Sequence, residues 1–240
     1  MIAADRAGLD QPHVEVGPPL RERQRREPAR EPAADDGDVA GNGFGHGHAA
    51  DLASKTRSGY RFPMHAAPLI TPATPDDAKP VAAIYAHHVA HGTATYDIEP
   101  RSALATAGLI SEHRAKGWPF LIARGADGTV AGYAYASQFR DRPAYAWACE
   151  DSIYIDPAHQ GRGIGRALLE ALLAAAEAAG FRTMIAVIGG AEPASVALHA
   201  RCGFAHAGRL DASGWKQGRW LDTVFMQRAL GAGAASPPPE

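Results

Sequence analysis

The chain has 240 residues and a formal net charge of −2, so it lacks the strongly basic character of many nucleic-acid-binding and membrane-surface proteins. No apolar run reaches the roughly 18 residues of a membrane span, and the N-terminus lacks the apolar core of a secretion signal. Cys149 and Cys202 match no metal or redox spacing and indicate reduced thiols. We therefore expect a cytoplasmic protein that binds neither nucleic acid, membrane nor metal.

The first 63 residues differ in composition from the rest of the chain. They are rich in Arg, Asp, Glu, Gly, Pro and Ala, and their large apolar residues follow no structural period. Such a segment cannot bury enough surface to offset the entropy of ordering it. His46 and His48 could be metal ligands, but a disordered segment that happens to contain histidines is the favoured interpretation. We expect residues 1–63 to be a disordered extension, or sequence upstream of a true start at Met64.

The remaining chain predicts one folded domain over residues 66–230, followed by a disordered tail over residues 231–240. A short apolar strand begins the domain, and Thr74, Pro75 and Asp77 then occupy the first positions of a helix. That helix carries Val81, Ile84, Tyr85 and His88 at helical spacing. After a loop, a second helix over residues 101–117 ends at Gly117.

Three strands are predicted next, over residues 119–124, 129–139 and 145–156. Asp127-Gly128 marks a hairpin turn between the first two. A glycine-rich turn then opens a long helix that ends near Gly180, with an apolar stripe of Ile164, Leu168, Ala171, Leu172 and Ala175. A strand over 181–189, a short helix over 192–203, and strands over 204–214 and 221–230 complete the pattern. This order predicts an α/β fold with a mixed sheet covered by helices on both faces.

The turn "GRGIG", residues 161–165, follows a strand and opens a helix. Backbone N–H groups and the helix dipole make such a turn a binding site for phosphate, and Arg162 and Arg166 add positive charge. The spacing fits neither a Walker loop nor an early Rossmann fingerprint. A plain connection without a ligand is the alternative that residue spacing alone leaves open.

The spacing Gln160-x-x-Gly163-x-Gly165 resembles the pyrophosphate loop of the GNAT family of N-acetyltransferases. Residues 132–169 and the stretches "FRTMIAVIG", "ASVALH" and "GWKQGRWLDTVFMQ" are similar to phosphinothricin and methionine sulfoximine acetyltransferases. The stretch "HGTATYDIEPRS" fits their substrate loop. The resemblance covers residues 68–230 and implies a GNAT fold with a central, mostly antiparallel twisted sheet. It also implies acetyl-CoA as co-substrate, a small amine as acceptor and a homodimer.

The resemblance implies one set of residues for acetyl-CoA. They lie on the strand that pairs with the pantetheine arm, in the pyrophosphate loop and on the helix after the fifth core strand: Ile153, Tyr154, Ile155, Gln160, Gly161, Arg162, Gly163, Ile164, Gly165, Arg166, Glu192, Ser195 and Arg201. Glu192 stands where the family usually has an asparagine. A carboxylate cannot donate the hydrogen bonds of an amide, so we expect Glu192 to weaken cofactor binding.

Acetyl transfer requires a neutral amine, a polarised thioester and a proton or partner charge for the leaving thiolate. Glu150 interrupts an apolar run, where burial raises a carboxyl pKa toward the range of a general base. The resemblance places the family's catalytic glutamate there, whereas a structural Glu–Arg pair is the alternative. His199 stands at the position of a tyrosine that protonates the thiolate in many GNAT enzymes. A histidine that only packs in the core is the other interpretation.

Substrate contacts are implied for the loop before this strand and for the residues beside Glu150. Two guanidiniums suit a small, doubly anionic amino acid, although a solvated loop is the alternative. The implied set is Tyr96, Arg140, Asp141, Arg142, Glu150, Asp151 and Ser152, with Lys216, Arg219 and Trp220 as further candidates.

The sequence thus predicts direct acetyl transfer from acetyl-CoA to the α-amine of an amino-acid analogue such as phosphinothricin or methionine sulfoximine. No Ser or Cys is paired with a base within sequence reach, so no covalent enzyme intermediate is expected. One alternative is another acceptor: a polyamine, an antibiotic or a protein N-terminus. The other is a non-catalytic acyl-CoA-binding module.

Overall fold

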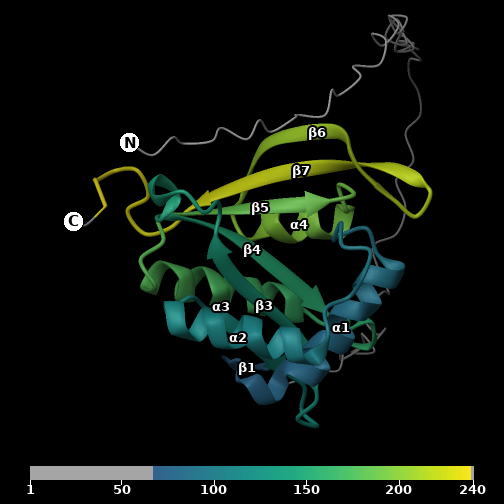
Figure 1. Ribbon diagram of the computed structural model, residues 1–240. Helices are drawn as coiled ribbons and strands as arrows, with labels where there is room; N and C mark the ends of the chain where they lie inside the picture. The colour runs from purple at the N-terminus through teal and green to yellow at the C-terminus, as the bar shows by residue number, and fades with distance from the viewer. Residues whose placement is uncertain (1–66, 239–240) are drawn as a thin grey trace, which may run out of the picture. The chain divides into compact units, whose positions relative to one another are not determined.

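The computed structural model describes residues 67–238 (Figure 1). Seven strands form one sheet in the order β1-β2-β3-β4-β5-β7-β6. The strands are β1 (Leu69–Pro72), β2 (Phe120–Arg124), β3 (Val130–Gln138), β4 (Ala148–Ile155), β5 (Thr183–Gly189), β6 (Ala205–Lys216) and β7 (Arg219–Ala229). The helices are α1 (Ala78–His91), α2 (Ala103–Lys116), α3 (Ile164–Ala178) and α4 (Pro193–Arg201). The predictions for residues 1–63, including His46 and His48, lie outside the described residues.

The sheet is mixed and mostly antiparallel, as predicted. Only β4 and β5 run parallel among the neighbouring strands of the described chain, and every other pair is antiparallel. A parallel pair needs a crossover, and α3 supplies it between β4 and β5. The parallel pair therefore places the glycine turn at the start of α3 directly after β4.

Helices cover both faces of the sheet because the strands alternate their side chains between two cores. On β3, Tyr133 and Tyr135 pack with residues of α1 and α2. Ala134 and Ala136, which lie between and beyond them, pack on the opposite face with α3. The residues of β2 alternate in the same way between the core with α1 and α2 and the core with α3. This confirms the predicted layered architecture.

The helix ends follow the predicted chemistry. The carboxylate of Asp77 accepts a 2.9 Å hydrogen bond from the backbone N–H of Thr74 and begins the turn that leads into α1. Ser102 caps α2 by accepting from the N–H of Ala105 at 3.1 Å. Gly117 ends α2 with φ +69°, the left-handed conformation that glycine adopts without strain.

The buried face of α3 is wider than the predicted stripe. Ile164, Leu168 and Leu172 are buried as expected, but Leu169, Leu173 and Ala176 are buried as well. Ala171 and Ala175 are only partly buried against the core. The stripe is wider because α3 contacts β2, β3, β4 and α4, so it lies in a concave surface.

The last two strands are longer than predicted and form a hairpin around Gln217 and Gly218. Both residues have positive φ, 51° and 72°, which is the backbone pattern of a tight type I′ turn. A bulge between Leu210 and Gly214 shifts the register of β6 against β7. This hairpin forms one edge of the sheet and lies beside the loop between α1 and α2, as the hydrogen bonds below show.

Residues 231–234 form turns and residues 235–236 form a bend, within the segment for which the sequence predicts a disordered tail. Arg182 donates hydrogen bonds to the carbonyl oxygens of Gly233 and Ser236, both at 3.1 Å. Among the described helices, none is both long and apolar enough to cross a membrane.

Candidate functional site

Strands β4 and β5 separate shortly after they begin. The two strands pair only where Ala148–Glu150 of β4 lie beside Thr183–Ile185 of β5. Beyond these residues, β4 continues to Ile155 and β5 to Gly189 without pairing to each other. A cavity of about 170 Å³ lies where they part. It is lined by residues of β4, β5, α4 and the α1–α2 loop: Ala94, Thr95, Tyr96, Glu150, Asp151, Ser152, Ile153, Tyr154, Ala186, Val187, Ile188, Gly189, Ser195 and His199. We call it the strand cavity.

A second cavity, of about 650 Å³, adjoins the strand cavity, and we call it the loop groove. The two share Ala94, Ile153, Tyr154 and Ser195. Every residue that the sequence predicts for acetyl-CoA lines the loop groove except Arg162. The fold thus brings together β4, the glycine turn and α4, which lie far apart in the sequence.

The glycine turn has the geometry that an anion site requires. Gly161 and Gly163 have φ of +72° and +79°, and a Cβ at either position would meet no atom within 4 Å. The turn leads into α3, whose first N–H groups have no intrahelical acceptor. Free N–H groups and the positive end of the helix dipole point to this end of the groove, so the residues fit a phosphate or diphosphate.

Charged side chains border the loop groove on several sides. Arg166 and Arg201 supply positive charge, although Arg166 Nε also donates to Glu170 at 2.7 Å. Glu192 occupies the N-cap of α4 and is the one carboxylate of the described chain that lines the groove. The end of α1 contributes His87, His88 and His91, which sequence reasoning missed because residue type alone does not show that α1 ends beside the groove.

His88 also fixes one backbone group of the predicted pantetheine strand. Its Nε2 donates to the carbonyl oxygen of Ile155 at 2.9 Å. Burial lowers the pKa of His88 and favours the neutral ring. The end of β4 is therefore held against α1.

Glu150 lies at the point where β4 and β5 begin to part. Its side chain is 34% exposed, and a carboxylate oxygen lies 3.6 Å from Nη1 of Arg140. Burial raises the pKa of Glu150, the positive charge of Arg140 opposes that rise, and Asp151 adds to it. The net rise makes this carboxylate a better proton acceptor than an exposed one.

Asp151, the next residue of β4, forms a buried pair with His199, and both residues line the strand cavity together with Glu150. The distance from Asp151 Oδ2 to His199 Nε2 is 3.0 Å, and each side chain is 2% exposed. Burial opposes protonation of His199, but the hydrogen bond and negative charge of Asp151 outweigh it and raise the pKa of the ring. The pair is separated by 48 positions in sequence, so only the tertiary structure reveals it.

The hydrogen bonds of His199 occupy both ring nitrogens. Nδ1 lies 2.7 Å from the carbonyl oxygen of Ser195, which can only accept, so Nδ1 carries a proton. Nδ1 therefore cannot take a proton from the Ser195 hydroxyl, which lies 3.4 Å away. Because Nε2 is held by Asp151, this arrangement favours the packing interpretation of His199 over that of a free proton donor.

The predicted arginine loop divides into residues near the strand cavity and residues away from it. Arg140 reaches Glu150, and its guanidinium stacks over the ring of Phe139 at 4.0 Å. Asp141 instead lines a surface hollow with Lys116, and Arg142 lines neither the strand cavity nor the loop groove. A short 3-10 helix over Pro143–Tyr145 follows Arg142, and the sequence pattern did not predict it.

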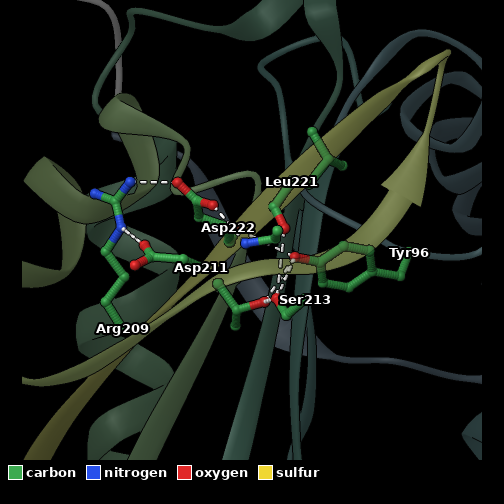
Figure 2. A network of polar contacts seen from close by, with 8 residues as sticks. Tyr96, Arg209, Asp211, Ser213, Leu221 and Asp222 are labelled. Carbon is green, nitrogen blue, oxygen red and sulfur yellow. Dashed lines mark hydrogen bonds and ion pairs between the residues drawn. The ribbon is translucent and has the colours of Figure 1, made fainter. Parts of the chain in front are cut away.

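Tyr96 lines the strand cavity and is anchored to the β6–β7 hairpin (Figure 2). Its hydroxyl lies 2.6 Å from Thr223 Oγ1 and 3.1 Å from the carbonyl oxygen of Asp222. Asp222 also forms an ion pair with Arg209, which holds the bulged strand beside it. This network fixes the loop between α1 and α2 over the cavity.

The three further candidates on the hairpin lie outside the strand cavity. Lys216 is buried and donates to the carbonyl oxygen of Thr95 at 2.8 Å, so it supports the loop that carries Tyr96. Arg219 is exposed, and Trp220 is exposed and packs edge-on against Trp215. Within residues 67–238, no three His, Cys, Asp or Glu side chains are grouped as a metal site.

Comparison with known proteins agrees with this geometry. The profile of the acetyltransferase (GNAT) family matches residues 74–204. A phosphinothricin N-acetyltransferase from Alcaligenes faecalis is 44% identical over 164 residues, which span 68% of this chain and 83% of that protein. An L-methionine sulfoximine/L-methionine sulfone acetyltransferase from Salmonella typhimurium is 36% identical over 164 residues, 66% of this chain and 92% of that protein.

A solved structure is similar over the whole folded region. The crystal structure of a phosphinothricin acetyltransferase from Sinorhizobium meliloti in complex with acetyl-CoA has a TM-score of 0.72 and 47% identity. The match covers 73% of this chain and 95% of that one. Sequence, fold and the glycine turn after β4 agree, and the chain belongs to the GNAT family of acetyltransferases.

Proposed function

We propose that this chain transfers the acetyl group of acetyl-CoA to the α-amine of a small amino-acid analogue such as phosphinothricin or methionine sulfoximine. The observation that carries the proposal is the junction of the two cavities. A phosphate-binding turn lies at one end of the loop groove, and a carboxylate with a raised pKa lies in the strand cavity that adjoins it. The similarity to acetyltransferases of these two compounds supports the substrate class.

Acetyl-CoA supplies the acetyl group through its thioester, and coenzyme A leaves as the free thiol when its sulfur takes up the second proton that the nitrogen loses. The turn over residues 160–166 binds its diphosphate through backbone N–H groups, and the β4 backbone over residues 153–155 aligns its arm. Glu150 accepts a proton from the ammonium group, directly or through a water, so that the nitrogen lone pair becomes available. No Ser or Cys of the two cavities has a base free to activate it, which supports direct transfer.

Arg140 is proposed to bind the acidic head of the substrate. Arg140→Ala is expected to raise the KM for the amine about 10-fold and leave that for acetyl-CoA unchanged. Because Arg140 holds down the pKa of Glu150, the acid limb of the pH profile should also move to higher pH. Arg142→Ala is the matched control, and its amine KM should stay within about twofold of the wild type. An unchanged KM for the amine in Arg140→Ala would place Arg140 outside the substrate site.

Glu192 lines the loop groove and forms no ion pair with another described residue. Glu192→Asn should tighten acetyl-CoA binding by about two- to tenfold at low salt, because a like charge near the phosphates is removed while asparagine remains a good N-cap. Calorimetric titration at two ionic strengths measures this effect, which should shrink as salt is added. Weaker binding by the variant would mean that the carboxylate makes a favourable contact.

The function is tested by acetylation assays with a panel of amines. The panel contains L-phosphinothricin, L-methionine sulfoximine, spermidine, an aminoglycoside and a peptide with a free N-terminus. The proposal expects the two amino-acid analogues to give the highest kcat/KM. Preference for another amine favours a different acceptor class. Binding of acetyl-CoA without turnover of any amine favours the non-catalytic module.

The proposal includes a cytoplasmic homodimer that needs no metal. The family resemblance supports the dimer, and the β6–β7 hairpin offers an exposed sheet edge with Trp215 and Trp220 at its end.

A further inference from the structure

One oxygen of Asp151 is buried without a partner. His199 binds Oδ2, whereas Oδ1 is inaccessible to solvent and forms no hydrogen bond with any described residue. Leaving a buried acceptor unpaired costs about 1–3 kcal/mol, and more when the group is charged. Asp151 lines the strand cavity, so a ligand that contacts Oδ1 after a small movement of the side chain would supply the missing hydrogen bond.

The hydroxyl-bearing residues that line the strand cavity, Thr95, Tyr96, Ser152 and Ser195, form no hydrogen bond with Asp151 Oδ1. Opposite β4, the cavity is bounded by Ala186, Val187 and Ile188 of β5, whose side chains carry no donor. Glu150 lies on the same strand and is itself an acceptor. A buried carboxylate prefers a donor that carries positive charge. In the proposed reaction, the amine is the group with such N–H bonds.

We infer that Asp151 Oδ1 accepts a hydrogen bond from the α-amino group of the substrate, while His199 holds the carboxylate in place and compensates its charge. This inference rests on the proposed function and makes Asp151 Oδ1 the acceptor that positions the substrate nitrogen. Glu150 takes up the proton that the amine loses, and Asp151 fixes the nitrogen beside it. His199 acts through Asp151 and is a positioning residue.

Charge compensation gives the pair an advantage over a lone carboxylate. An isolated buried carboxylate would stabilise the ammonium form, which has no free lone pair. Both nitrogens of His199 face acceptors, the carbonyl oxygen of Ser195 and Asp151 Oδ2, so a protonated ring satisfies both hydrogen bonds and its charge offsets that of Asp151. The pair can therefore hold a neutral amine as well as an ammonium group.

Few other ionisable groups face the pair within the described chain. On β4 they are Glu150, which is paired with Arg140, and the buried thiol of Cys149. Cys202, after α4, is the other thiol that the charge of Asp151 affects. Burial raises the pKa of both thiols, so they stay neutral near pH 7.

Two variants at Asp151 distinguish the role of its acceptor oxygen from the role of its negative charge. In Asp151→Asn, the amide nitrogen can donate to His199 Nε2, and the carbonyl oxygen takes the place of Oδ1 as an acceptor. The double variant Asp151→Ala with His199→Phe removes both partners and leaves no unpaired charge in the core. Thermal melting verifies that each variant is folded. Asp77→Asn is the control, since Asp77 is a buried carboxylate outside both cavities.

The readout is calorimetric titration of each protein with L-methionine sulfoximine, together with the KM values for both substrates. Asp151→Asn should bind the amine within about threefold of the wild type, whereas the double variant should bind it on the order of 10- to 100-fold more weakly. Acetyl-CoA affinity should not change in either variant. Asp77→Asn should change melting temperature and not amine affinity.

His199→Gln tests the charge compensation. Glutamine can still donate to Asp151 but carries no charge, so the ammonium form is held more tightly. The profile of kcat/KM for the amine should then move by about one pH unit toward alkaline pH. An unshifted profile, or a double variant with wild-type amine affinity, would overturn the inference while leaving the proposed function intact. A wild type that neither binds nor acetylates the amine would overturn both.

Discussion

Glu150→Gln is expected to retain the fold and acetyl-CoA affinity but to lower kcat by about 10²- to 10⁴-fold, the usual cost of losing a general base. The amide keeps the size of the side chain and removes its ability to take a proton. Steady-state kinetics at saturating concentrations of both substrates measure the loss. Glu112→Gln, on the exposed face of α2, is the control and should have wild-type kinetics.

Two further measurements separate this role from a structural ion pair with Arg140. Burial raises the pKa of Glu150 above its ordinary value of 4.5, so the folded state favours the protonated form. The ionised form therefore costs stability above that pKa, and Glu150→Gln should not lower the melting temperature at pH 7. Activity of the wild type should fall as pH decreases through the pKa of Glu150. A variant with full kcat and a lower melting temperature would show that the carboxylate is structural.

Gly163→Val is expected to weaken acetyl-CoA binding by at least about 100-fold, because a β-branched residue resists φ of +79° and its side chain would project into the groove. The turn would move its N–H groups away from the diphosphate. Gly128→Val is a matched control: Gly128 has φ +78°, equally free space around its Cβ and a place in the β2–β3 turn. Both variants should lose similar stability.

Calorimetric titration with acetyl-CoA distinguishes the two glycine variants. Gly128→Val should bind with wild-type affinity, and Gly163→Val should show almost no heat at the same concentrations. If both bind equally well, the turn over residues 160–166 is only a connection between β4 and α3.

The sequence predicted the elements well where local chemistry decides them. The end of α2 at Gly117 and the Asp127-Gly128 turn depend on neighbouring residues alone. The full buried face of α3 was not predicted, because it depends on the concave surface that other elements form. The Gln217-Gly218 turn was missed because glutamine is not a usual residue at positive φ.

The site shows the same division. The glycine turn is a local motif, and its place beside β4 follows from the crossover rule. The resemblance supplied Glu150 and the acetyl-CoA residues, which the fold gathers along one groove. By contrast, the partner of His199 depends on contacts between distant segments, and the sequence did not show that Arg142 lines neither cavity. No spacing in the sequence encodes the 3.0 Å approach of Asp151 to His199.

The most direct test of the central claim follows the acetyl carbon. The protein is mixed with acetyl-CoA labelled with ¹³C at the carbonyl and with L-methionine sulfoximine, and the products are followed by NMR. The account predicts that the label appears as an amide on the α-nitrogen, with one free thiol released for each amide formed, and that Glu150→Gln slows both together. Label that remains in acetyl-CoA, or appears as acetate without an amide, would contradict it.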